Sequence, residues 1–375
     1  MELFDVYSIF NIAPVSAKGH HLTDREGNTY LDLYGGHAVI SIGHAHPVYV
    51  QNLKEQLDRL AFYSNSVVNP LQQEVADKLE LASGCTDYSL FMCNSGAEAN
   101  ENALKLASFH TQKSRIVAFN NGFHGRTSAA VAVTDNASIQ APINKQHAVT
   151  FLAMNDTEAL ENTLKQGDVA AIIIEIIQGV GGLDKPEAGF LSVLSELAKK
   201  YGALVIADEV QSGFGRTGKF FAYQYYDFQP DIITMAKGMG NGFPVAGLLI
   251  HYRIKARKGM LGTTFGGNPL ACTAVLSVLE VLEKENLLEN ARQMEEYFHK
   301  KAMTLAPSVR VKGKGLMLGL DFGFPVKELR ANLINKHKIF TGSSKDPNVL
   351  RILPPLNIGK QELDNLFDAL KSEVS

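Results

Sequence analysis

The chain has 375 residues, of which 45% are hydrophobic and 20% are charged, and its formal net charge is −3 at pH 7. This near-neutral balance gives no electrostatic case for binding nucleic acid or an anionic membrane surface. Three cysteines without metal-ligand spacing indicate reduced thiols rather than a disulfide framework. No basic segment followed by an apolar run opens the chain, and no stretch approaches 18 uncharged apolar residues, so we expect a cytoplasmic protein without membrane spans.

The first 50 residues are expected to be rich in strands. Residues 21–24 and 29–33 flank a turn that contains Gly27, which is a good hairpin signal. His44 and His46 have the H-x-H spacing of some metal sites. No third ligand of the right kind lies near them, and turn residues before a proline explain the pattern better, so we expect no metal.

Between residues 61 and 270, apolar strands alternate with amphipathic helices. This pattern predicts an α/β fold with a mostly parallel seven-stranded sheet covered by helices. The expected strands are 88–93, 115–119, 148–152, 170–174, 204–207, 232–235 and 246–250. Ligands of such sheets gather at the carboxyl ends of the strands. A chemically suggestive residue follows five of these strands: Ser95, His124, Glu175, Asp208 and Lys237.

Lys237 closes a buried strand, where desolvation lowers the pKa of an amine and makes it a nucleophile that can form a Schiff base. A single lysine at a strand end more often extends to solvent. Here, however, an earlier apolar strand ends on Asp208. Pyridoxal phosphate needs this pair, an amine for its aldehyde and an acid for its ring nitrogen.

Two further segments fit that cofactor. Residues 94–101 lie between a strand and a helix expected from 102 to 110, and Gly96 lets the backbone present N–H groups to a phosphate. Taken alone, this segment is equally a helix N-cap. Phe123 supplies a ring that could stack on a cofactor, and Arg126 suits bidentate binding of a carboxylate, although alone they would indicate only a glycine-rich turn.

After residue 270 the chain changes character. A helical stretch over 270–303 has a break near 283–286, and the glycines at 313–319 lack the spacing and the following helix of a dinucleotide-binding fingerprint. We expect three parts: an N-terminal segment, 1–50, that packs with the small domain; a large cofactor-binding domain, 51–270; and a small α+β C-terminal domain, 271–375.

Together these motifs resemble the class-III pyridoxal-phosphate-dependent aminotransferases of fold type I, over nearly the whole chain. The most specific parts are residues 94–101, 123–126, 207–218, 236–238 and 264–269. Within that class, the F-H-G-R motif and the short length are most similar to enzymes that act on N-acetylornithine in arginine biosynthesis.

The resemblance implies roles around the cofactor. Lys237 would bind the cofactor and carry the proton of the reaction, while Asp208 would keep the ring nitrogen protonated. Gln211 would lie near the ring hydroxyl and Phe123 would stack on the ring. Thr264 would reach the phosphate of the neighbouring subunit, so the active site would need a homodimer. The other cofactor contacts would come from Ser95, Gly96, Ala97, His124 and Glu175.

The resemblance also implies two carboxylate sites for small-molecule substrates. Arg126 would hold the free carboxylate of an N2-acylornithine, which reacts at its distant terminal amine. Glutamate reacts at its α-amine and presents a second carboxylate, which suits Arg351. One site would then serve both halves of a ping-pong cycle that yields N-acyl-L-glutamate 5-semialdehyde and, from 2-oxoglutarate, glutamate.

Two residues depart from the family pattern. Val180 replaces a glutamate that commonly neutralises the arginine at position 351, so a substrate group, another residue or water is expected to cover Arg351. His37 stands where related enzymes usually carry an aliphatic residue or a tyrosine. With Tyr63 it would line the pocket for the substrate tail, or it is a hydrogen-bonded structural histidine. These changes leave both acetyl and succinyl open as the acyl group.

Three other interpretations remain. The substrate of the same fold could be free ornithine, 4-aminobutyrate or another ω-amine. A cofactor-free binding protein on this scaffold is disfavoured because Lys237 and Asp208 are both present. A nicotinamide enzyme is weaker still, since no G-x-G-x-x-G lies between a strand and a helix.

Overall fold

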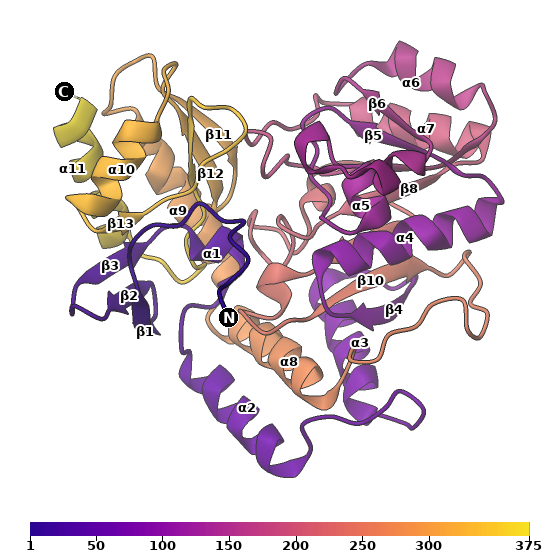
Figure 1. Ribbon diagram of the computed structural model, residues 1–375, viewed down its shortest axis with the longest axis horizontal. Helices are drawn as coiled ribbons and strands as arrows, with labels where there is room; N and C mark the ends of the chain where they lie inside the picture. Colours follow the sequence, from indigo (N-terminus) through magenta and orange to yellow (C-terminus); the bar gives the residue numbers. More distant parts are fainter. Residues whose placement is uncertain (375) are drawn as a thin grey trace.

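A computed structural model describes residues 1–374. These residues form three sheets, of which the largest has seven strands in the order β4-β10-β9-β8-β7-β5-β6 (Figure 1). Its strands are β4 (Tyr88–Cys93), β5 (Arg115–Phe119), β6 (Val149–Leu152), β7 (Val169–Ile174), β8 (Leu204–Asp208), β9 (Ile232–Met235) and β10 (Ala246–His251). Only β10 runs antiparallel to its neighbours in this sheet. The predicted α/β fold with a mostly parallel seven-stranded sheet is therefore confirmed.

Helices cover both faces of this sheet, so both faces are buried. Side chains of successive residues along a strand point to opposite faces. Along β7, Ile173 packs with α4 (Gly96–Thr111) on one face, whereas Ile172 and Ile174 join the cluster that contains α7 (Phe190–Tyr201) on the other. The remaining helices of this region are α3 (Pro70–Ser83), α5 (Ser128–Ala132) and α6 (Thr157–Leu164). The continuous apolar runs of the central strands follow from this double burial.

The start of α4 differs from the sequence-based expectation. The helix begins at Gly96, six residues before the predicted Asn102. Ser95 is its N-cap, and the Ser95 hydroxyl accepts a hydrogen bond from the backbone N–H of Glu98 (3.2 Å). The first turn of the helix thus lies directly at the carboxyl end of β4, where its free N–H groups face the edge of the sheet.

The N-terminal strands share a sheet with the C-terminal part of the chain. The sheet has the order β1-β2-β3-β13, with β13 (Ile339–Phe340) parallel to β3 (Figure 1). The other strands are β1 (Pro14–Lys18), β2 (His21–Asp24) and β3 (Thr29–Asp32), so the predicted hairpin is confirmed. The histidines of the H-x-H motif each contact a separate carboxylate: His44 contacts Asp32 and His46 contacts Glu285, both at 2.8 Å. Within residues 1–374 no group of three potential ligands gathers for a metal ion.

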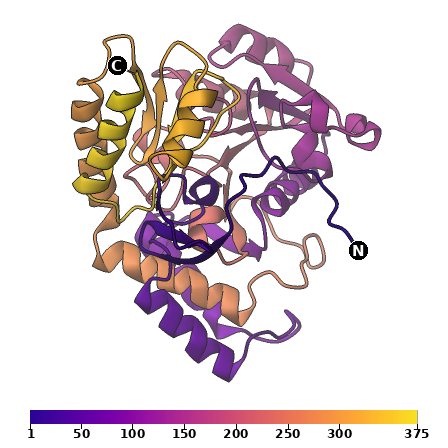
Figure 2. The same ribbon diagram turned by 60° about the vertical axis from the view of Figure 1, so that its left-hand side comes forward.

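The C-terminal part begins with two helices, α8 (Pro269–Lys284) and α9 (Leu287–Ala302), separated near Asn286, which has a left-handed backbone (φ 50°). Helix α8 lies beside α2 (Pro47–Arg59) (Figure 2). The C-terminal part also contains a three-stranded sheet and two more helices: β11 (Arg310–Lys314), β12 (Met317–Asp321), β14 (Val349–Ile352), α10 (Lys327–Asn335) and α11 (Lys360–Val374). None of the helices in residues 1–374 is long and apolar enough to cross a membrane.

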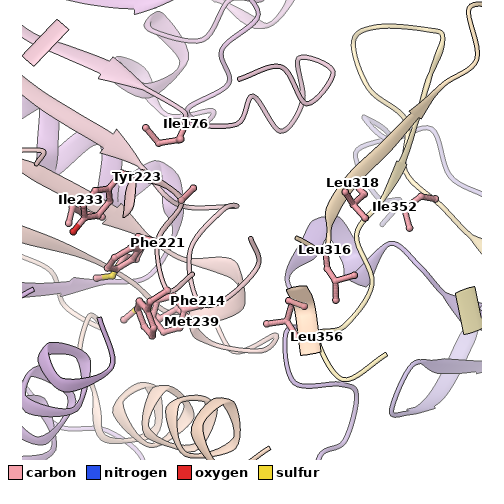
Figure 3. Packing of buried hydrophobic residues seen from close by; sticks show 14 of the residues in the cluster. Ile176, Phe214, Phe221, Tyr223, Ile233, Met239, Leu316, Leu318, Ile352 and Leu356 are labelled. Carbon is pink, nitrogen blue, oxygen red and sulfur yellow. The ribbon is translucent and has the colours of Figure 1, made fainter. Parts of the chain in front are cut away.

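The large sheet and the C-terminal part share one apolar cluster, in which Phe214 and Met239 lie toward Leu316 and Leu356 (Figure 3). Arg216 crosses the same boundary with only 2% of its surface exposed. Its guanidinium donates to the backbone carbonyls of Leu316 (3.1 Å) and Pro354, and burial lowers its pKa to about 9. This contact fixes the C-terminal part against the loop that follows β8. The exact domain bounds expected from the sequence stay a prediction.

Candidate active site

A cavity of about 390 Å³ opens at the carboxyl edge of the large sheet. It is lined by residues from the ends of β4, β5, β7, β8 and β9, as expected where parallel strands end. The sequence-predicted residues that meet here are Ser95, Gly96, Ala97, Phe123, His124, Arg126, Glu175, Asp208, Gln211 and Lys237. Segments more than 100 residues apart in the chain thus share one site.

Lys237 follows β9 in a short 3-10 turn, Lys237–Met239. Its backbone has a φ of 49°, the left-handed region that costs a residue with a side chain about 1 kcal/mol or more. The side chain is half-buried, and within residues 1–374 its amine forms no hydrogen bond or ion pair. Desolvation lowers the pKa of Lys237 despite the opposing charges of Asp208 and Glu175. The amine is therefore free and readily deprotonated, which is the state of a nucleophile.

Asp208 is buried and is held from both sides. Its Oδ2 accepts hydrogen bonds from His124 Nδ1 (2.7 Å) and Asn100 Nδ2 (2.8 Å), and its Oδ1 accepts one from the backbone N–H of Val210 (3.0 Å). Thr234 in turn donates to the side-chain oxygen of Asn100 (2.7 Å). Because Oδ2 already has two donors, Oδ1 is the oxygen with capacity for a cationic donor in the cavity. Asn100 was not singled out from the sequence, although it lies one helical turn after Gly96.

His124 and Glu175 flank this network. Burial opposes protonation of His124, but its hydrogen bond to Asp208 and the charges of Asp208 and Glu175 together outweigh that effect and raise the pKa of His124. The two oxygens of Glu175 accept the backbone N–H groups of Phe123 (2.8 Å) and Gly179 (2.9 Å), and burial raises the pKa of Glu175 to about 6. Glu175 thus ties together two loops at the sheet edge.

The first turn of α4 forms the other end of the cavity. Ser95, Gly96 and Ala97 present N–H groups that have no acceptor within the helix, at its positive end. A Cβ atom on Gly96 would lie 2.7 Å from Cγ1 of Val210, so only glycine lets these loops pack together. This end of the cavity suits a phosphate.

The donor and acceptor groups fit pyridoxal phosphate. A free amine, a fixed carboxylate and a helix N-terminus line one cavity, and Phe123 adds an aromatic ring. The buried Oε1 atom of Gln211 has no partner in residues 1–374, while its amide nitrogen donates to the carbonyl of His37 (3.2 Å). That unpaired acceptor matches a cofactor hydroxyl, because buried polar atoms are rarely left unsatisfied.

A second, larger cavity of about 1030 Å³ shares Phe123, Arg126, Val180, Gln211 and Lys237 with the first, and Arg351, Tyr34 and His37 extend it. Arg351 is 3% exposed and donates to the carbonyls of Ser343 (2.5 Å) and Gly179 (2.7 Å). Burial lowers its pKa, and no carboxylate in residues 1–374 pairs with it. The two carbonyls therefore cover Arg351 without neutralising it.

His37 lies at the mouth of this second cavity, in a left-handed turn where its φ is 68°. Tyr34 Oη contacts its ring at Nδ1 and Nε2, the latter at 3.0 Å. Desolvation, followed by the charges of Arg351 and Lys237, lowers the pKa of His37 to about 4, so the ring is neutral at physiological pH. Both the substrate-binding and the structural interpretation of His37 agree with this position.

Tyr63 and Thr264 are exposed and line neither cavity. The neighbouring rings of Phe62 and Phe265 contact each other with centroids 5.5 Å apart. A single chain therefore does not bring these two predicted site residues to Lys237.

The fold and the site define a pyridoxal-phosphate-dependent transaminase. The chain belongs to the class-III aminotransferases, since the model of that family matches residues 5–374. The chain is 39% identical to an acetylornithine aminotransferase from Bacillus subtilis, over 100% of this chain and 97% of that one. It is also 39% identical to one from Archaeoglobus fulgidus, over 98% and 97% of the two chains. These findings confirm the resemblance read from the sequence.

Solved structures of transaminases have the same fold as this chain. An ornithine aminotransferase from Toxoplasma gondii superposes with a TM-score of 0.89 at 26% identity, covering 98% of this chain and 91% of that one. An S-selective transaminase from an Arthrobacter species gives a TM-score of 0.90 at 26% identity, over 100% and 95% of the two chains. A second structure of the Toxoplasma enzyme is described with partial occupancy of PLP at its active site.

Proposed function

We propose that this enzyme moves the terminal amino group of an N2-acylornithine to 2-oxoglutarate, as a step of arginine biosynthesis. The observation that carries the proposal is the placement of two arginines, Arg126 and Arg351, in one cavity with Lys237. The names of the relatives that match nearly the full chain at 39% identity support the same substrate class. The acyl group is acetyl by this similarity, and succinyl is the alternative that a donor comparison decides.

Bound pyridoxal phosphate supplies an electron sink that stabilises negative charge on the reacting carbon. Lys237 would hold the cofactor through its free amine, and the same amine would carry the proton to and from the reacting carbon of the substrate. Asp208 would hold the ring nitrogen in its protonated form through Oδ1. Asn100 and His124 hold Asp208 in the orientation that this contact needs.

The remaining cofactor contacts follow from the same cavity. Gln211 would accept a hydrogen bond from the ring hydroxyl through its free Oε1, and Phe123 would supply an aromatic ring for stacking. Ser95, Gly96 and Ala97 hold the phosphate at the N-terminus of α4. His124 and Glu175 shape the site through Asp208 and the loop backbones.

The two arginines place the two substrates. Arg126 binds the carboxylate far from the reacting carbon, which is the α-carboxylate of the acylornithine and the side-chain carboxylate of glutamate. Arg351 binds the α-carboxylate of glutamate, next to the reacting carbon. His37, close to Arg351, lines the same side of the cavity without adding charge.

A donor screen tests this assignment. With 2-oxoglutarate as acceptor, we expect kcat/KM for an N2-acylornithine, acetyl or succinyl, to exceed that for free ornithine by about tenfold or more, because the acyl group removes the α-ammonium charge from the cavity. Coupled measurement of glutamate formation with acetylornithine, succinylornithine, ornithine and 4-aminobutyrate gives the comparison. A preference for free ornithine or 4-aminobutyrate would replace the proposed substrate by another ω-amine.

We further propose that two copies of the chain build the site together. Phe62 and Phe265 are 41% and 59% exposed and form an apolar contact at the surface, beside Tyr63 and Thr264. In a homodimer Thr264 reaches the phosphate of the partner copy and Tyr63 its substrate pocket. Light scattering of the holoenzyme should give twice the chain mass, and Phe265→Glu should lower both that mass and turnover. A fully active monomer would contradict the shared site.

A further inference from the structure

Arg351 is the buried arginine of this cavity, and no carboxylate of residues 1–374 forms an ion pair with it. Its guanidinium meets only the carbonyls of Gly179 and Ser343. The residue after Gly179 is Val180, whose side chain lines both cavities and whose carbonyl accepts the N–H of Lys345 (2.8 Å). Residue 180 thus directly follows the carbonyl that contacts Arg351, lines the same cavity, and is apolar.

The nearby acids are already engaged. Both oxygens of Glu175 accept backbone N–H groups, and Asp135 pairs with the amine of Lys345 (2.9 Å). Arg330, another cation close to Arg351, donates to the carbonyl of Thr341 (2.9 Å). Among residues 1–374, therefore, no carboxylate contacts the guanidinium of Arg351, and the charge of Glu175 acts on it only from a distance.

We propose that Val180 leaves Arg351 as a carboxylate-binding site that stays open in both halves of the cycle and takes up a small free anion whenever the donor is an ω-amine. This rests on the proposed function, in which glutamate brings a carboxylate next to the reacting carbon and the acylornithine does not. A buried cation without a counter-charge is costly, so an anion of the size of formate or chloride binds beside the acylornithine.

The two donors consequently differ in their relation to such an anion. Glutamate and the anion need the same guanidinium of Arg351, so they exclude each other. The reacting carbon of the acylornithine carries a hydrogen atom where that of glutamate carries the α-carboxylate, so the guanidinium stays accessible and donor and anion bind together. Residue 180 sets this difference, because a carboxylate at that position would occupy Arg351 from within the protein.

Formate is the probe. In half-reactions of the holoenzyme followed by cofactor absorbance, we expect formate to raise the apparent KM for glutamate in proportion to its concentration. It should leave the apparent KM for N2-acetylornithine unchanged or lower it. In Val180→Glu the KM for glutamate should rise about tenfold and formate inhibition should weaken by a similar factor, because the new carboxylate pairs with Arg351. The matched variant Val180→Gln has the same shape without the charge and should keep the formate competition.

An equilibrium measurement separates this proposal from the substrate assignment. Formate should raise the thermal unfolding midpoint of the wild-type holoenzyme and of Val180→Gln, and have much less effect on Val180→Glu. If acetylornithine is not a donor, 4-aminobutyrate takes its place in the half-reaction, and the formate pattern is still measured. Formate competing equally with both kinds of donor would overturn the proposal, as would equal loss of formate binding in the Gln and Glu variants. Should Val180→Glu not fold, the wild-type pattern with the two donors decides alone.

Discussion

Replacing Lys237 by alanine is expected to lower transamination turnover by about 10⁴-fold or more. Among residues 1–374, Lys237 supplies the only side-chain amine that lines the first cavity, and burial lowers its pKa. The loss should appear in both half-reactions, measured separately with glutamate and with the acylornithine donor, because both need the same proton transfer.

Lys237→Arg is the matched control, since it keeps a positive charge but provides no amine that binds an aldehyde. It should be as inactive as the alanine variant. Adding a small primary amine such as methylamine to Lys237→Ala should restore part of the proton transfer. Turnover of the alanine variant within tenfold of the wild type would contradict the role of Lys237.

The second large effect is expected for Asp208→Asn, in which kcat should fall by about 10³-fold. An amide cannot hold the ring nitrogen of the cofactor in its protonated form, so the electron sink is weakened. The substitution also offers one oxygen to the donors of His124, Asn100 and Val210, where the carboxylate offers two. Single-turnover absorbance with glutamate measures the rate, and a shift in the spectrum of the bound cofactor reports the changed ring nitrogen.

The neighbouring carboxyl group provides the control for this variant. Glu209 accepts the hydroxyl of Ser212 (2.6 Å) and the N–H of Tyr223 (2.8 Å) and lines neither cavity. Burial raises the pKa of Glu209 to about 7, so its loss of charge is tolerated near neutral pH. Glu209→Gln should retain kcat within about threefold and the wild-type spectrum. Equal losses in the Asp208 and Glu209 variants would show that only packing, not the ring-nitrogen contact, was disturbed.

The large sheet was predictable because its physical signal is local. Residues such as those of β7 form short apolar runs between polar turns, and burial on both faces demands that composition. The candidate cofactor-binding residues that follow the strands could be located for the same reason, since each comes after such an apolar run. Lys237 and Asp208 could be paired from the sequence only because parallel strands all end at one edge of the sheet.

What the sequence did not give depends on contacts between distant segments. Asn100 could not be identified from the sequence, because an asparagine inside a helix carries no signal until the fold brings Asp208 and Thr234 to it. The start of α4 was placed too late because polar residues such as Glu98 and Asn100 interrupt the apolar pattern of its first turns. The surroundings of Arg351 likewise depend on two carbonyls. That of Gly179 lies more than 100 residues away in the chain, and that of Ser343 lies in a neighbouring loop.

The most direct measurement is the position of the covalent bond between the protein and its cofactor. Borohydride reduction of the holoenzyme, digestion and mass spectrometry of the peptides locate the lysine that carries the phosphopyridoxyl group. We predict that the group lies on Lys237 and on no other lysine. A label on a different lysine, or a protein that takes up no cofactor at all, would contradict the active site described above.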